Sequence, residues 1–96
     1  MNKQVAKILS EIGLTVHLLE RIVERGIELS VRDVQMMMAI DKSSSGDFAL
    51  FNTKTGTFVP FTVERGMVAL KTVMKLASHQ ANNKADRDNV TLINYK

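Results

Sequence analysis

Apolar residues recur at spacings of four and three along the start of the chain and form a stripe about three heptads long. The stripe consists of Val5, Leu9, Ile12, Val16, Leu19 and Val23, here called the association stripe, and Ile27 extends it. Charged residues such as Lys7 and Glu11 fall away from it, as in an amphipathic helix. The pattern predicts a helix over residues 3–25.

Gly13 leaves two arrangements open for this predicted helix. A glycine in the middle of a helix costs about 1 kcal/mol relative to alanine. Gly13 could therefore end a first helix, with Thr15 capping a second. The apolar phase continues across Gly13 without a slip, however, and this favours one continuous helix.

A second helix is predicted over residues 31–42, directly after Ser30. Serine is a favoured N-cap residue, and Asp33 follows three positions later, as in a capping box. The segment is apolar nearly all round, so we expect it to be buried on more than one side. It includes three consecutive methionines at residues 36–38. Methionine also suits adaptable binding surfaces, but three consecutive residues point around a helix, and the run is interpreted as core filling.

The pattern then changes to one typical of strands. Residues 47–51 and 57–61 are rich in strand formers, and five turn-type residues ending in Gly56 separate them. This arrangement predicts a β-hairpin. Pro60 has no N–H to donate, so its strand is predicted to be an edge strand or to have that side free.

A third helix is predicted over residues 63–81, with Thr62 as its N-cap. Apolar residues again repeat at spacings of four and three, at Val63, Met67, Leu70, Met74 and Ala77. This second stripe is the expected intramolecular partner of the association stripe. Residues 82–89 are polar and predict a loop. Residues 90–95 are rich in strand formers and predict a third strand, the alternative being a tail over 90–96.

Together these elements predict a single α+β domain over residues 1–96, in the order helix, helix, strand, strand, helix, strand. The three helices are expected to pack on a small antiparallel β-hairpin or sheet. A chain of 96 residues buries roughly two thirds of its unfolded surface, which suffices for folding without staples. It contains no cysteine, so disulfides and cysteine-based zinc sites are excluded.

Charge is distributed unevenly along the chain. Residues 1–47 carry six Lys and Arg against seven Asp and Glu, whereas residues 48–96 carry seven against three, a net charge of +4. Three basic residues of the predicted third helix stand four apart on one face. With one residue of the second helix, the candidates for anion or nucleic-acid contact are Arg32, Lys71, Lys75 and His79. The alternative is a solvated helix face whose cations complement the helix dipole.

A winged helix-turn-helix is the alternative architecture, because helices precede a two-stranded hairpin and residues 31–42 would occupy the position of the recognition helix. A helix that reads a DNA groove needs Arg, Lys, Asn or Gln on its exposed face. Among many apolar residues, only Arg32, Gln35 and Lys42 meet this need. A nucleic-acid-binding transcriptional regulator is therefore the alternative function and not the preferred one.

Residues with catalytic or ligand chemistry are sparse. His17 and His79 have no Asp or Glu at ligand spacing, and two histidines without cysteine make no common zinc set unless carboxylates complete it. The serines before Gly46 lack the glycine-lysine pattern of a phosphate loop. We therefore expect no catalytic residue, no metal, no cofactor and no enzyme activity.

The N-terminal sequence and the apolar runs bear on location. No secretory pattern is present, and no run approaches the roughly 18 apolar residues that a membrane span needs. We expect a cytoplasmic protein that does not enter a membrane.

The association stripe leaves two interpretations open. It could pack on the predicted helix at residues 63–81 within one chain, or it could dock on a second copy or on a partner helix. A small domain has limited surface with which to cover so long a helix. We therefore expect a non-enzymatic interaction protein that self-associates, with a dimer favoured, and that regulates or inhibits a macromolecular partner by binding it. A protein partner is favoured over nucleic acid.

Overall fold

The computed structural model describes residues 22, 24–27 and 29–96, and the association stripe and Gly13 lie outside these residues. The described residues form helices α3 (Val31–Met38) and α4 (Ser78–Asp88) and five strands. The strands are β1 (Gly46–Asn52), β2 (Thr57–Glu64), β3 (Met67–Leu70), β4 (Met74–Lys75) and β5 (Thr91–Tyr95). The fold is α+β, but the prediction of three helices on an antiparallel hairpin is wrong, because the sheet is larger and mixed.

The predicted hairpin is confirmed. β1 and β2 pair antiparallel, with Phe51 opposite Phe58 next to the connecting loop. The side-chain oxygen of Asn52 accepts hydrogen bonds from the backbone N–H groups of Lys54 and Thr55, at 2.9 and 3.2 Å. A side-chain oxygen that accepts from the following backbone stabilises a tight turn, so Asn52 holds this loop in place.

The predicted helix over residues 63–81 is wrong, because the segment contains the end of β2, a turn, β3 and β4, and only residues 78–81 are helical. β2 continues to Glu64, the chain reverses at Arg65 and Gly66, and β3 returns antiparallel along β2. Both turn residues have positive φ, 53° and 75°, as in two-residue turns that match the twist of a hairpin. After a break in the ladder, β4 pairs with the start of β2.

The break between β3 and β4 lies beside Pro60. The Pro60 carbonyl oxygen accepts a hydrogen bond from the backbone N–H of Lys71 at 2.9 Å. The N and C=O of one residue in an antiparallel ladder face the same neighbouring strand. The proline nitrogen therefore faces the segment between β3 and β4, to which it can donate no hydrogen bond. Pro60 has its N–H side free as predicted, although β2 lies inside the sheet.

Residues 82–89, expected to be a polar loop, belong mostly to α4. The helix buries only Ala81 and Ala85 and ends at Asn89, which has a left-handed backbone conformation. The chain then enters β5, which pairs with β1 in parallel. The strand predicted over residues 90–95 is thus confirmed, and its direction makes the sheet mixed.

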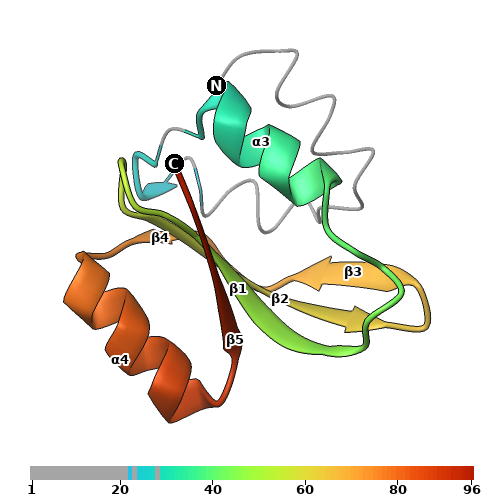
Figure 1. The fold of residues 1–96 in the computed structure, drawn as a ribbon. Helices are drawn as coiled ribbons and strands as arrows, with labels where there is room; N and C mark the ends of the chain where they lie inside the picture. Colours follow the sequence, from blue (N-terminus) through green and yellow to red (C-terminus); the bar gives the residue numbers. More distant parts are fainter. Residues whose placement is uncertain (1–21, 23, 28) are drawn as a thin grey trace.

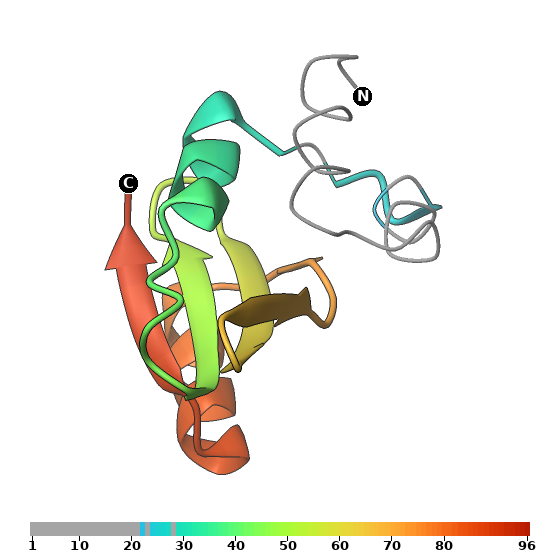
Figure 2. The same cartoon turned by 90° about the vertical axis from the view of Figure 1, so that its right-hand side faces the viewer.

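The sheet separates the two helices into layers. Its strand order is β3-β2-β1-β5, with β4 also beside β2, and α3 and α4 lie against opposite faces (Figure 1). Figure 2, turned by 90°, again places the strands between the two helices. The described residues therefore form two cores, one on each side of the sheet.

The core on the α3 side is the larger. It contains Ile22, Ile27, Val34, Met37, Leu50, Val59, Phe61, Val63, Val73 and Tyr95. On the α4 side, Ala81 packs with Ala49, Phe51 and Phe58. A fully buried Phe or Leu side chain stabilises the fold by roughly 1.5–3 kcal/mol, so the phenylalanines of the hairpin contribute to both layers.

Candidate functional site

An apolar pocket lies between the C-terminal end of α3 and the sheet face that α3 covers. Its volume is about 230 Å³. The described lining residues come from five parts of the chain and are Met36, Ala39, Ile40, Asp41, Ser44, Phe48, Leu50, Phe61 and Ile93. We call this cavity the α3 pocket.

The sheet supplies a rigid aromatic wall for the α3 pocket. Phe48 of β1 and Phe61 of β2 are paired across the two strands. Their rings stack with centroids 5.5 Å apart and an angle of 18° between the planes, a favourable arrangement for aromatic pairs. Met36 on the helix side is only half-buried, and its unbranched side chain adapts easily to different contact surfaces.

The early end of α3 opens one edge of the pocket. The sequence predicted a helix to residue 42, but α3 ends at Met38. The backbone N–H of Ala39 still bonds to the carbonyl oxygens of Gln35 and Met36, at 3.0 and 3.2 Å. Beyond it the chain leaves the helix, so that Ile40 contributes to the lining and the following loop passes along the edge.

Asp41 is the one charged residue among the described residues that line the α3 pocket. Its Oδ1 accepts hydrogen bonds from the Ser43 hydroxyl at 2.6 Å and from the Ser43 backbone N–H at 2.9 Å. These bonds, the hydroxyl bond first, hold the pKa of Asp41 below its ordinary value of 3.8. The carboxylate is therefore ionised at neutral pH and fixed in orientation beside an apolar cavity.

Asp33 is a second carboxylate of interest, because it is fully buried. Its Oδ1 accepts hydrogen bonds from Asn52 Nδ2 at 2.9 Å and from the Tyr95 hydroxyl at 2.7 Å. The backbone N–H of Ser30 donates to Oδ2 at 2.9 Å, and the Asp33 N–H donates to Ser30 Oγ at 3.1 Å, which confirms the predicted capping box. Burial raises the pKa of Asp33, but the hydrogen bonds together outweigh it and lower the pKa below 3.8. Asp33 therefore joins α3 to β1 and β5.

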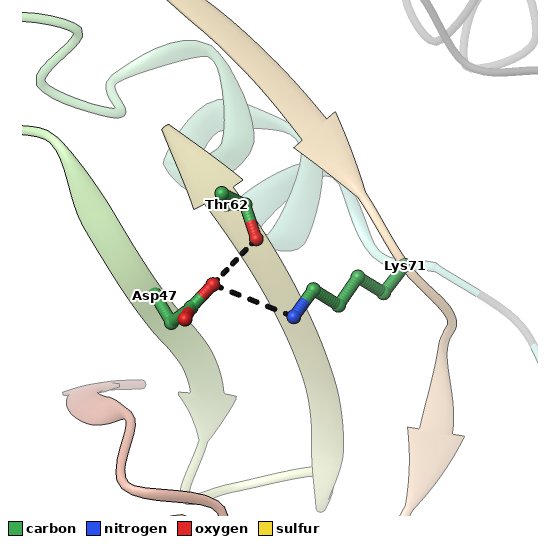
Figure 3. Close-up of polar contacts among 3 residues, drawn as sticks. All are labelled: Asp47, Thr62 and Lys71. Atoms are coloured by element: carbon green, nitrogen blue, oxygen red, sulfur yellow. Dashed lines mark hydrogen bonds and ion pairs between the residues drawn. The ribbon is translucent and has the colours of Figure 1, made fainter. Parts of the chain in front are cut away.

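Lys71, predicted to lie on a helix, lies in the break between β3 and β4. Its Nζ is 3.4 Å from Oδ1 of Asp47, and the same oxygen accepts a hydrogen bond from Thr62 Oγ1 at 2.6 Å (Figure 3). The hydroxyl bond first and the lysine second hold the pKa of Asp47 below 3.8. Side chains that are half exposed make weak ion pairs, so this group is a weak surface contact among β1, β2 and the segment between β3 and β4.

The other candidates for anion contact are dispersed. Lys75 lies in β4 and donates to Thr57 Oγ1 at 3.0 Å, and His79 is exposed in the first turn of α4. Arg32 lies on α3, on the opposite side of the sheet, where its Nε donates to the carbonyl oxygen of Lys96 at 3.0 Å. The predicted basic helix face therefore does not exist, because its residues occupy a strand break, a strand and a different helix.

Metal and membrane sites can be assessed for the described part of the chain. Within residues 22, 24–27 and 29–96, no three His, Cys, Asp or Glu side chains gather as metal ligands would. Among the same residues, no helix has the length and apolar character to cross a membrane.

No family model, curated protein or solved structure matches this chain. The α3 pocket is therefore the feature on which a functional interpretation rests.

The sequence contained no direct sign of the α3 pocket. The sequence predicts strands at Phe48 and Phe61 and a helix at Met36, and all three residues lie in elements of the predicted type. Their convergence depends on the packing of α3 against the hairpin and on the position of β5. Asp41 was assigned to the helix over residues 31–42, where it would have had no relation to a cavity.

Proposed function

We propose that this protein acts by binding and not by catalysis, and that the α3 pocket takes up one large apolar side chain of a macromolecular partner. The size of the pocket supports this proposal. Its volume of about 230 Å³ lies below the roughly 300–1,000 Å³ of most small-molecule sites, yet an apolar cavity of about 150 Å³ already holds a benzene ring. Anchor side chains that fill such pockets contribute most of the binding energy in many interfaces.

The chemistry of the lining is in keeping with a binding role. Asp41 and Ser44 are the polar side chains among the described lining residues, and both are exposed at the edge. Asp33, the buried carboxylate, uses its oxygens for bonds within the fold. Binding to the pocket would let the protein regulate or inhibit its partner by occupying a surface of that partner.

Self-association through the association stripe remains part of the proposal. The expected intramolecular partner of that stripe was a helix over residues 63–81, but only residues 78–81 of this segment are helical, and residues 63–64, 67–70 and 74–75 are in strands. Ile27, which extends the stripe, packs in the core on the α3 side together with Ile22. The structure therefore does not contain the helix over residues 63–81 with which the association stripe was expected to pair inside the chain.

Binding to the α3 pocket can be tested with two matched variants and two short peptides. One peptide carries phenylalanine at its centre and the other alanine, in an otherwise Gly-Ser sequence. We expect the phenylalanine peptide alone to shift the methyl NMR resonances of Met36, Ile40 and Ile93 in the full chain. Ala39→Phe should fill the pocket and abolish these shifts. Ala69→Phe makes the same change at an exposed position of β3 and should leave them intact.

Equal shifts with both peptides, or shifts that persist in Ala39→Phe, would contradict the proposed function. Circular dichroism and thermal unfolding establish that both variants are folded before the peptides are compared.

A further inference from the structure

We propose that the partner segment recognised by the α3 pocket carries a cationic residue, Arg or Lys, directly beside its apolar anchor. This inference rests on the proposed function and specifies the chemistry of the partner. The cation would pair with Asp41 while the anchor enters the pocket.

The position and orientation of Asp41 carry this inference. The two hydrogen bonds from Ser43, at 2.6 and 2.9 Å, both reach Oδ1. The carboxylate is therefore held in place before any partner arrives, and less side-chain entropy is lost on binding. A charge-assisted hydrogen bond to a fixed carboxylate is also stronger than a bond between neutral groups.

The charges around the pocket agree with a cationic partner. Ion pairs between described residues join Lys71 to Asp47 and Lys84 to Asp88, and neither involves Asp41. The neighbouring Lys42 is not among the lining residues. A partner that approaches the apolar lining therefore meets the carboxylate of Asp41, which forms no ion pair with another described residue. Complementary charge across an interface favours the matching partner and disfavours like charge.

The apolar and acidic features lie close enough for two adjacent residues of one peptide to reach both. Ile40 and Asp41 are consecutive in the chain, and both line the cavity. Phe48 and Phe61 form the wall behind them. A segment with the order anchor–cation, or cation–anchor, satisfies both features without a long connection.

The experiment compares three short peptides on the full chain, with Phe-Arg, Phe-Ser or Phe-Glu at the centre of a Gly-Ser sequence. Dissociation constants come from the methyl shifts of Met36, Ile40 and Ile93. An exposed ion pair contributes about 0.2–1 kcal/mol, so Phe-Arg should bind about 1.4- to fivefold more tightly than Phe-Ser, and Phe-Glu more weakly than both. The preference should shrink as salt is added, because the pair is exposed.

Asp41→Asn should remove the difference between the Phe-Arg and Phe-Ser peptides. Asp86→Asn is the matched control, since Asp86 is exposed on α4 at the other face of the sheet, and there the preference should be unchanged. Equal binding of the three peptides, or a preference for Phe-Arg that survives Asp41→Asn, overturns the inference and leaves the proposed function standing. Absence of pocket shifts with every peptide removes the proposed function itself.

Discussion

Asp33 and Tyr95 form a buried polar contact between α3 and β5. The Tyr95 hydroxyl donates to Asp33 Oδ1 at 2.7 Å, and both residues are buried. Burial first, and then the adjacent carboxylate, raise the pKa of Tyr95 above its ordinary value of 10.0. The neutral hydroxyl is thus the form that the fold requires.

This contact predicts an unusual alkaline titration. A group whose pKa is raised by folding contributes stability that is present below its unfolded pKa and is lost as the pH rises above it. We therefore expect the tyrosinate absorbance of the native protein to stay low as the pH passes 10.0 and to rise only when the chain unfolds. The chain has one tyrosine and no tryptophan, so the absorbance reports Tyr95 alone.

The control is the same titration in concentrated urea, where the phenol should ionise near its ordinary pKa. Circular dichroism recorded at each pH separates ionisation from unfolding. Reversible ionisation near pH 10 with unchanged circular dichroism would show that the hydroxyl is accessible and that the contact is absent.

At the scale of elements, the hairpin, α3 and the last strand were predictable because local pattern decided them. Strand formers flank a turn that ends in Gly56, and Ser30 with Asp33 marks the start of a helix. The segment over 63–81 was wrongly predicted as a helix because its apolar residues fit both the four-and-three spacing of a helix and the alternation of a strand. In the structure Val63 and Leu70 belong to the core on the α3 side, whereas Met67, paired with Glu64, is 74% exposed.

Neither α4 nor the α3 pocket could be predicted from the sequence, for two different reasons. The apolar face of α4 consists of Ala81 and Ala85 only, and two small residues in a polar sequence give almost no periodic pattern. The α3 pocket requires the relative positions of α3, β1, β2 and β5, and no local pattern encodes these positions. The order of the strands arises from the crossover through α4, of which residues 82–88 were expected to be a loop.

The connection between β1 and β2 predicts a difference between two glycine substitutions. Gly56 and Gly66 have similar positive φ values, +82° and +75°, so alanine costs about 1–2 kcal/mol at each through the backbone alone. A Cβ at residue 56 would also lie 2.8 Å from the carbonyl oxygen of Leu76, whereas nothing lies within 4 Å of one at residue 66. Gly56→Ala should therefore lower the free energy of unfolding by about 1–3 kcal/mol more than Gly66→Ala.

Urea unfolding of the two variants measures this difference, and Gly66→Ala serves as the control for backbone strain. An equal loss of unfolding free energy in the two variants would mean that the chain near Leu76 moves away from the new Cβ at little cost. This result would contradict the close approach that the hydrogen bond from the Leu76 N–H to the Gly56 carbonyl oxygen, at 2.9 Å, maintains.

At the scale of the whole molecule, the proposed self-association depends on the association stripe. Leu9→Glu places a charge within the stripe, whereas Ser10→Glu places it on the opposite side of the predicted helix. We expect sedimentation of the unaltered chain to depend on concentration, Leu9→Glu to sediment as a monomer, and Ser10→Glu to behave like the unaltered chain. A monomer at every concentration for all three chains would rule out self-association.

The crossover through α4 also has a consequence for the order of folding. β1 and β2 are joined by the short loop 53–56, whereas β5 pairs with β1 at positions such as Phe48 and Thr91, far apart in the chain. Closing a long loop costs entropy before its contacts form, so β5 joins the sheet late. Tyr95 arrives with it, and only then does Asp33 of α3 gain its hydroxyl donor.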